Sequence, residues 1–536
     1  MTTSASAVSE YLRAVLHRTR HSMDPPGFRI DWADQPWRHK VYPGVDRLPL
    51  PVDGTAPGGT LADTLWQPDA TPPEAPLPLR SLAGMLRDSY GVLGRKVRVN
   101  GNHDDDVQGS FRHAHWFRGA AAGGGLYPCE IYWVVGPGGD VRPGVYHYAA
   151  PHHALRPLLA GNVAPRVRAA LGDPPGSATG EQFLLVTVRF WKNAFKYNNF
   201  SYHCVTMDVG ALLYTWVLWA RAAGVALRTA FWFDEVALDD LLGLDPMVES
   251  ALAVVPLPGP PGGSAAELTA DTARVSRRPA ERSRTVTRFP WLEEVHRSTL
   301  ERATERPGES DFAAAAVGDP VGDGEVALPD PDSDALRTDL RDVLRARRSS
   351  FGLQAAEPPL AAADLATILA TCGHGRHIPA DFRGADGEPP LTRLAVFANH
   401  VAGVGSGAYL YSAGRHALVP VPGNPVNPFL QQHYVLDNYN LEQVAAVLVV
   451  LARTQAAVET VGARAYRAVN AEVGAVAQSA YLVSAALGVG CGVALGLDNI
   501  AFAERLGVAE TQERPYLLLM IGHERAVQAD VTDRFG

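Results

Sequence analysis

The pattern of apolar and polar positions predicts alternating helices and strands over most of the chain. Apolar residues at a spacing of three to four indicate helices, and short apolar runs bounded by glycine, proline or aspartate indicate strands. The predicted helices are 8–20, 82–90, 200–224, 291–303, 334–347, 361–370 and 464–487, and the predicted strands are 129–135, 145–148, 183–189, 227–233, 394–401, 408–411 and 516–522. Elements mixed in this way favour an α+β fold with helices packed on an antiparallel-rich sheet.

One stretch of this pattern occurs twice. The eight residues Tyr202, Val205, Val209, Gly210, Ala211, Gly224, Val225 and Asp234 recur 264 positions later as Tyr466, Val469, Val473, Gly474, Ala475, Gly488, Val489 and Asp498. The blocks GVYHYAAPHHAL from Gly144 and GAYLYSAGRHAL from Gly407 share seven of twelve residues at an offset of 263. The chain is therefore expected to contain two copies of one domain in tandem.

Breaks in the pattern set the expected boundaries. An N-terminal helix and a proline-rich extended lead occupy 1–80, the first copy 81–258, a linker 259–332 and the second copy 333–536. The run PLPGPPGGS ends the first copy, and the linker is rich in Arg, Glu, Pro and Gly. We expect the linker to wrap on the surface or to be partly disordered. Lead and linker match no part of the repeat, so peptide or partner contacts are expected there.

Composition narrows the classes of function. A chain of 536 residues, 46% of them hydrophobic, can bury two cores. A net charge of −9 argues against nucleic-acid binding. The four cysteines lie far apart and the histidines lack ligand spacing, so neither a disulfide framework nor a metal site is expected. The N-terminus lacks a signal-peptide core, and residues 480–497 are too glycine-rich for a convincing membrane span. We expect a cytoplasmic protein without membrane contact.

A basic segment in the second copy is a candidate phosphate site. The run RARRSSFG contains Arg347, Arg348 and Ser349, whose forked donors and hydroxyl suit a phosphate monoester. A basic helix end favoured by the helix dipole is the alternative.

A glycine-rich segment in the first copy is a candidate cofactor loop. Gly123, Gly124 and Gly125 precede Leu126 and a strand, so the backbone can approach a flat ligand closely and offer its N–H groups. The segment is not a dinucleotide motif, because no helix follows it. A glycine-rich hairpin entry is the alternative. The second-copy segment aligned with it, from Pro389, contains no glycine.

Two further pairs of residues suggest chemistry. Lys196 and Tyr197 lie among aromatic residues before the long helix, where a lysine of lowered pKa and a phenol suit proton abstraction from carbon. A lysine that extends its head group to solvent beside a half-buried tyrosine is the alternative. The aligned second-copy residues are threonine and valine. Arg464 and Arg467 are placed on the second long helix to reach an anion, or simply to face solvent.

Together these motifs resemble the nitroreductase superfamily, and more narrowly the SagB-type FMN-dependent azoline dehydrogenases of ribosomal peptide natural product biosynthesis. In that family a Lys-Tyr pair is implicated in catalysis, and it maps to Lys196 and Tyr197. The PSAGALYP loop maps to 121–128, with Ala122 in place of serine, and the RGYR motif is kept as Arg464–Arg467. The resemblance implies flavin sites at a dimer interface, each built from both partners.

The resemblance therefore implies an intramolecular pseudo-dimer of two nitroreductase-like domains that holds one FMN. The clamp of Arg347, Arg348 and Ser349 and the turn Gly488-Val489-Gly490 come from the second copy, and the glycine loop comes from the first. The implied reaction is dehydrogenation of thiazolines or oxazolines in a precursor peptide, made by a partner cyclodehydratase, with Lys196 or Tyr197 as base and dioxygen as final oxidant.

Two alternatives stay open at this point. One is another flavin reaction, such as peptide desaturation or nitro or quinone reduction. The other is a flavin-free scaffold that binds a peptide or partner. The sequence leaves open the peptide, the preferred azoline, and whether chains associate further.

Overall fold

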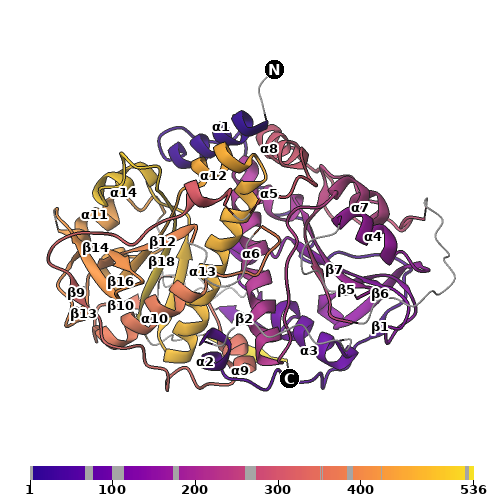
Figure 1. Ribbon diagram of the computed structural model, residues 1–536, viewed down its shortest axis with the longest axis horizontal. Helices are drawn as coiled ribbons and strands as arrows, with labels where there is room; N and C mark the ends of the chain where they lie inside the picture. Colours follow the sequence, from indigo (N-terminus) through magenta and orange to yellow (C-terminus); the bar gives the residue numbers. More distant parts are fainter. Residues whose placement is uncertain are drawn as a thin grey trace, which may run out of the picture.

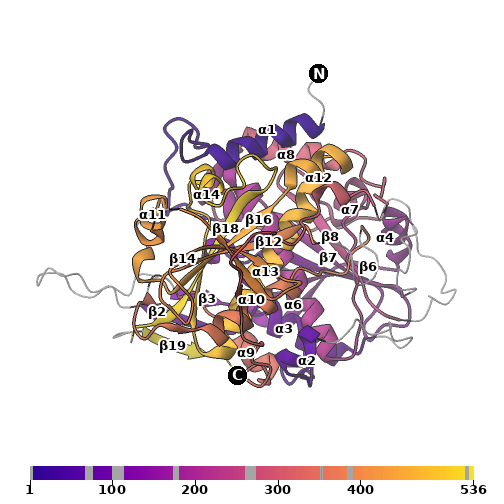
Figure 2. The same ribbon diagram turned by 60° about the vertical axis from the view of Figure 1, so that its left-hand side comes forward.

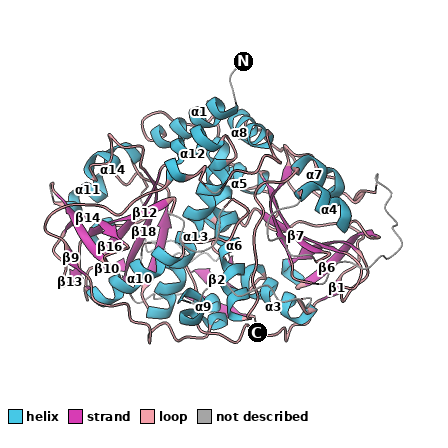
Figure 3. Ribbon diagram, in the orientation of Figure 1, coloured by secondary structure: helices cyan, strands magenta, loops and turns pink. Residues whose placement is uncertain are grey.

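Two β-sheets flank a central pair of long helices in the computed structural model (Figure 1, Figure 3). The structure describes residues 4–66, 77–98, 114–172, 180–259, 273–308, 310–350, 352, 354–382, 390–423, 425–436, 438–525 and 530–535. The helices up to residue 300 are α1 Ser4–His17, α2 Leu61–Trp66, α3 Leu79–Tyr90, α4 Ala164–Leu171, α5 Trp191–Tyr197, α6 Ser201–Ala222, α7 Glu235–Leu242 and α8 Pro290–Leu300. The strands of this part are β1 Leu48–Pro49, β2 Gly94–Arg98, β3 Ala114–Phe117, β4 Cys129–Val135, β5 Gly144–Ala149, β6 Ala154–Ala160, β7 Gln182–Arg189 and β8 Glu249–Pro256.

The rest of the chain supplies a matching set. Its helices are α9 Leu340–Ala346, α10 Ala362–His374, α11 Val426–Gln432, α12 Thr454–Val461, α13 Ala465–Leu487 and α14 Asn499–Arg505. Its strands are β9 Val326–Ala327, β10 Gln354–Ala355, β11 Leu360–Ala361, β12 Thr392–Ala398, β13 Val401–Ala402, β14 Gly407–Ser412, β15 Ala417–Val421, β16 Ala446–Ala452, β17 Gly490–Ala494, β18 Arg514–Glu524 and β19 Asp530–Arg534.

The two main sheets have the same topology. The first runs β1-β6-β5-β4-β7-β8, and the second repeats this order as β9-β15-β14-β12-β16-β18, with all of these neighbours antiparallel. Equivalent elements are offset by 263 or 264 residues, as in β4 and β12 or α6 and α13. The predicted tandem repeat and its antiparallel α+β class are therefore confirmed.

A hydrogen-bonded corner shows how closely the copies agree. Tyr148 contacts Nδ1 of His153 at 3.0 Å, and Tyr411 contacts Nδ1 of His416 at 2.8 Å. Both histidines have positive φ, 42° and 48°. Each ring then bonds a carbonyl that lies outside the repeat seen in the sequence, Pro51 O in the lead and Pro329 O in the linker. Lead and linker thus hold equivalent places next to the sheets, and we propose that each structural unit begins there, near residues 48 and 326.

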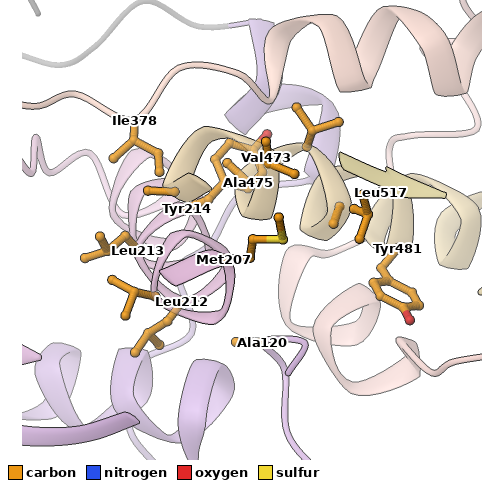
Figure 4. Packing of buried hydrophobic residues seen from close by; sticks show 14 of the residues in the cluster. Ala120, Met207, Leu212, Leu213, Tyr214, Ile378, Val473, Ala475, Tyr481 and Leu517 are labelled. Atoms are coloured by element: carbon orange, nitrogen blue, oxygen red, sulfur yellow. The ribbon is translucent and has the colours of Figure 1, made fainter. Parts of the chain in front are cut away.

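The long helices α6 and α13 run side by side through the middle of the molecule (Figure 1). A Cβ atom built on Gly210 would lie 2.0 Å from Ala471 O, and one built on Gly474 would lie 1.9 Å from Met207 O. Figure 4 shows Met207 between the two helices. Because these two contacts are exchanged by the 264-residue offset, the halves pack about a pseudo-two-fold axis like an isologous dimer.

Apolar packing divides each half into layers. One large cluster joins both long helices to the inner faces of both sheets. Two smaller clusters lie on the outer faces, beneath α4 and α7 in one half and beneath α11 and α14 in the other. Each sheet is therefore covered on both faces, and the shared inner core fixes the two halves relative to each other.

The chain ends bind the halves together. The N-terminal helix α1 lies across the N-terminal ends of α6 and α13, where Tyr11 donates to Asn199 O at 2.8 Å and contacts the rings of Tyr202 and Tyr466. At the other end the C-terminal strand β19 pairs with β2, which pairs with β3 (Figure 2). A strand of the second half thus completes a small sheet of the first.

Two predicted elements are wrong in part. The strand expected at 227–233 is irregular, with only single bridges from Thr229 to Ala380 and from Ala230 to Val254, because this segment crosses to the other half. The helix expected at 334–347 begins at Leu340, because the Asp339 side chain caps it by accepting two backbone N–H groups. Across the described ranges, no helix is both long and apolar enough to cross a membrane.

Candidate functional site

The glycine loop of the first half reaches across to the second half. Gln478 of α13 accepts the Ala121 N–H at 2.9 Å and donates to Gly119 O at 3.0 Å. Figure 4 shows Ala120, at the start of this loop, near α6 and α13. A side-chain amide that satisfies two backbone groups fixes the loop firmly. The sequence analysis did not identify Gln478, because only the folded chain brings position 478 to the loop.

The loop lies directly against the predicted catalytic pair. Gly124 has φ 62°, and a Cβ atom built on it would lie 2.7 Å from Tyr197 Oη and 3.2 Å from Lys196 Nζ. Gly125, with φ 65°, continues the left-handed turn, and Leu126 is buried beneath it. Glycine is therefore required at 124 both for its backbone angle and for the space that the pair occupies.

The predicted catalytic pair lies next to a strained turn. Lys196 and Tyr197 end α5, and the next residue, Asn198, has φ 41° and ψ −128°. The position equivalent to Asn198 in the second half is Gly462, which takes a positive φ without a side-chain penalty. In the first half Asp24 of the lead accepts a hydrogen bond from the Asn198 side chain. Strain held in place by neighbouring residues is typical of functional sites.

Burial shifts the pKa values of Lys196 and Tyr197 in opposite directions. It lowers the pKa of Lys196, chiefly through loss of solvent, and it raises the pKa of Tyr197 for the same reason. The amine is thus more easily neutral than usual, while the phenol holds its proton. Lys196 Nζ lies 4.8 Å from the centre of the Tyr197 ring. Of the two, Lys196 is the better base.

The basic segment after α9 meets the same loop from the other side. Arg347 is buried, donates to Arg118 O at 2.9 Å and lies 5.1 Å from the centre of the Tyr481 ring. Tyr481 in turn donates to Ser349 Oγ at 3.3 Å. Arg347 therefore lies beside the start of the glycine loop, and Tyr481, which carries no sequence motif, lies between Arg347 and Ser349.

The predicted glycine turn adjoins this segment. Gly488 ends α13 with φ 71°, the buried residues Val489 and Gly490 follow it, and Ser350 N bonds Cys491 O at 2.8 Å. Arg348 differs from Arg347, since it forms an ion pair with Glu524 and its side chain is 64% exposed. The structure thus brings the clamp and the turn together, with the Arg348 side chain directed to a surface carboxylate.

Arg464 and Arg467 are not brought to this site. Both bind the buried carboxylate of Glu235 on α7, and Arg467 also donates to Tyr202 Oη at 2.9 Å. Arg464 precedes Gln478 by fourteen positions, which is ~20 Å along a helix at 1.5 Å per residue. Among the described residues, Arg464 and Arg467 of the second half thus bind Glu235 and Tyr202 of the first half.

The structure also corrects one alignment. Because β4 and β12 are equivalent, Cys129 corresponds to Thr392, and the counterpart of the glycine loop is 383–391 rather than the segment from Pro389. That segment does contain glycines, Gly384 and Gly387. Residues 383–389 lie outside the described residues.

A flavin phosphate and ring fit the residues present. The buried Nε of Arg347 has no partner among the described residues, so this guanidinium retains a donor for an anion. The glycine loop offers backbone without side chains beside Lys196. Among the same described residues no set of three or more His, Cys, Asp or Glu side chains is arranged to hold a metal ion.

Comparison with known proteins agrees with this geometry. The sequence profile of the nitroreductase family matches residues 392–523, the core of the second half. The chain aligns over 97% of its length with the crystal structure of a putative nitroreductase from Anabaena variabilis, at a TM-score of 0.69 and 21% identity, covering 99% of that chain. The fold is that of two tandem nitroreductase-like domains.

Two relatives in sequence are informative. The trifolitoxin-processing protein TfxB of Rhizobium leguminosarum bv. trifolii is 31% identical over 152 residues, 26% of this chain. The chain spans only 39% of the length of TfxB. A putative nitroreductase of Methanocaldococcus jannaschii is 29% identical over 204 residues, which is 37% of this chain and 96% of that protein. The match to the nitroreductase family supports an oxidoreductase.

Proposed function

We propose that this nitroreductase-like chain binds one FMN between its halves and oxidises thiazoline or oxazoline rings of a precursor peptide to thiazoles or oxazoles. The observation that carries the proposal is the contact of Lys196 and Tyr197 with Gly124, in a loop held by Gln478 and Arg347 of the other half. The likeness to a trifolitoxin-processing protein supports a peptide substrate.

In this proposal both halves hold the cofactor. Arg347, Arg348 and Ser349 bind the phosphate, the turn 488–490 lies beside it, and the backbone of 123–126 faces the flavin ring. The Arg348 side chain is largely exposed, whereas its partner Glu524 is mostly covered, so Arg348 would have to leave this ion pair to bind the phosphate. For Arg464 and Arg467 we propose a structural role, since each is engaged by buried Glu235.

The chemistry requires the removal of two hydrogens from the azoline ring. FMN, when bound, supplies the acceptor for a hydride and its two electrons. Lys196 takes the proton from the ring carbon through its neutral amine, and burial lowers the pKa of this amine, which favours the neutral form. Tyr197 keeps its phenol proton and orients the amine. The C–H bonds are replaced by a ring double bond, the azole becomes aromatic, and dioxygen is the final electron acceptor.

The lead supplies a surface for the peptide. Trp32 is 50% exposed, its ring meets Phe195 edge-on at 5.5 Å, and Lys196 Nζ lies 6.0 Å from the ring centre. An exposed indole beside the base suits a flat heterocycle that must approach the site. The azoline must be made beforehand by a cyclodehydratase, which we propose as a partner in the cytoplasm.

The test uses the full chain reconstituted with FMN and a synthetic peptide that contains one thiazoline. The proposal expects loss of two hydrogens by mass spectrometry, without added NAD(P)H, together with oxygen uptake. An unchanged peptide in the presence of bound FMN would contradict the proposal.

A second candidate is reduction of nitro compounds or quinones, which the likeness to a putative nitroreductase favours. Turnover of a nitroaromatic with NAD(P)H, without peptide, would support that activity instead. Protein that stays colourless after incubation with FMN would point to a flavin-free binding scaffold.

A further inference from the structure

A buried carboxyl group of α6 lies beneath the glycine loop. Asp208 of α6 is 7% exposed, and its Oδ1 accepts the Gly123 N–H at 2.7 Å. Its Oδ2 is buried and has no partner among the described residues. A buried carboxyl with one satisfied oxygen and one unsatisfied oxygen is costly, and such costs are usually tolerated for function.

The surroundings of Asp208 hold no cation to balance an ionised carboxylate. The titratable groups that face it are Tyr90 of α3, Cys129 of β4, Tyr197 of α5 and Cys204 of α6, and all are neutral acids near pH 7. Among the described residues Asp208 forms no ion pair. Burial raises the pKa of Asp208 to about 8.

A second orphaned side chain lies at the same place. Asn193 of α5 is fully buried, and neither its amide nitrogen nor its amide oxygen has a partner among the described residues. A Cβ atom built on Gly123 would lie 3.7 Å from Asp208 Oδ1, 3.8 Å from Cys204 Cβ and 3.9 Å from Asn193 Nδ2. The glycine loop therefore packs against Asp208 and Asn193, and it leaves polar atoms of both side chains without hydrogen-bond partners among the described residues.

The equivalent residue of the other half provides a comparison. Glu472 accepts three hydrogen bonds, from Leu391 N at 3.0 Å, Thr392 N at 2.8 Å and Thr392 Oγ1 at 2.7 Å. The first half offers Pro128 where the second has Leu391, and proline has no N–H to donate. The carboxyl of Asp208 is therefore held by the loop alone.

We infer that Asp208 is a positioning residue of the site: as a neutral acid it fixes the glycine loop through Gly123 and so keeps Gly124 against Lys196 and Tyr197. An ionised carboxylate at this buried place would lack a balancing cation among the groups named above, so ionisation of Asp208 would destabilise the loop. This inference rests on the proposed function, since it concerns the same base and the same loop.

The first test needs neither flavin nor substrate. Between about pH 4 and pH 8 the folded chain keeps a proton on Asp208 that the unfolded chain has lost, so this group lowers stability progressively as pH rises. Asp208→Asn keeps the acceptor for Gly123 and cannot ionise. Its Tm should exceed that of the wild type by a margin that grows from pH 5 to pH 8. A margin that is absent, reversed or independent of pH would overturn the inference.

The second test is the pH profile of azoline oxidation. The wild type should lose activity above about pH 8 as Asp208 ionises, whereas Asp208→Asn should retain activity near pH 7 and keep it at pH 9. Asp208→Leu should lose bound flavin, because the loop is released. A basic limb that persists in Asp208→Asn would overturn the inference, as would full flavin content in Asp208→Leu. As a control, Glu472→Gln should still lose activity above about pH 8, as the wild type does.

The two tests separate the inference from the proposed function. If the stability margin grows with pH but the chain does not oxidise azolines, the proposed function fails and Asp208 still anchors the loop as a neutral acid. If azolines are oxidised but the margin is absent, the proposed function stands and the role of Asp208 falls.

Discussion

The pseudo-two-fold axis relates two faces of the contact between the halves, and the two faces carry different residues. At the composite site, Lys196, Tyr197 and Gly124 of the first half meet Arg347 and Gln478 of the second. At the opposite face, backbone bonds close the contact, from Thr229 N to Pro379 O at 2.8 Å and from Asp381 N to Thr229 O at 2.9 Å.

Side chains fill the opposite face as well. The linker supplies Arg306, which bonds Asp381 Oδ2 at 3.2 Å and Leu171 O at 2.9 Å. The rings of Trp232, Phe312 and Phe382 pack together, with centroids 4.9 to 6.2 Å apart. Among the described residues, the opposite face is therefore packed with aromatic side chains and an ion pair.

The sequence at the opposite face agrees with this difference. Residues 340–346 and 61–66 are equivalent helices, since Leu340 N bonds Gly59 O and Leu61 N bonds Thr338 O. The offset between these two helices places Pro68-Asp69-Ala70 where the second half has Arg347-Arg348-Ser349. The offset of 264 residues between the long helices places Thr460-Val461 where the first half has Lys196-Tyr197. Under the proposed function, duplication allowed one face to carry the chemistry while the other became a structural contact.

The largest effect on turnover is expected at Lys196, compared with the equivalent position Thr460. Lys196→Ala should keep its yellow FMN and lose ~10²–10⁴-fold in turnover, because the general base is gone. Thr460→Ala, the same change at the equivalent position, should leave turnover within a factor of two or so. Steady-state rates with the thiazoline peptide, at matched flavin content, check both. Equal loss in the two variants, or normal turnover in Lys196→Ala, would remove the assignment.

Next in size is a change at the buried arginines that hold the halves together. Arg467→Met should lower the free energy of unfolding by ~3–5 kcal/mol, because Glu235 keeps a buried charge with one cation fewer. The flavin content of the folded fraction should stay unchanged, since this residue is remote from the loop. Urea denaturation and absorbance measure the two quantities. Loss of flavin with an unchanged free energy of unfolding would instead indicate that Arg467 binds the flavin.

A smaller loss of stability is expected at the opposite face. Arg306→Met removes the cation beside Asp381, whose pKa burial already raises, and should cost ~2 kcal/mol because the arginine is partly exposed. Flavin content and turnover should not change. A gain of a second bound flavin in this variant would show that the opposite face is a blocked site rather than a structural contact.

The smallest effect compares neighbouring glycines. Gly124→Ala places a methyl group 2.7 Å from Tyr197 Oη at a positive φ, which should cost ~1–3 kcal/mol and weaken flavin binding about tenfold or more. Gly123→Ala meets nothing nearer than 3.7 Å and serves as the control, with affinity near that of the wild type. Flavin fluorescence titration of the apoprotein measures both. Equal affinities would place the flavin away from Gly124.

The parts predicted from the sequence are those that local pattern determines. The strand at 129–135 has its predicted bounds, and α6 and α13 lie within two residues of theirs, because their apolar periods are long and uninterrupted. Short elements such as α5, α7 and β17 were not predicted, and the segment 227–233 was misassigned because its partner is Ala380 of the other half.

The site divides in the same way. Lys196, Tyr197, Arg347 and the glycine loop were identifiable as motifs, and the structure brings them together. Gln478 and Trp32 carry no motif of their own, and their contacts are with residues far away along the chain. Arg464 and Arg467 fit a motif, yet only the fold shows that Glu235 engages them both.

The most direct test of the central claim is the ratio of FMN to chain in the purified full-length protein, from flavin absorbance after denaturation and an independent protein assay. One FMN per chain is expected, because the sequence carries the Arg347-Arg348-Ser349 clamp and the Lys196-Tyr197 pair once each, and the proposed site places both at one of the two faces. A ratio of two, or protein that takes up no FMN on reconstitution, would contradict it.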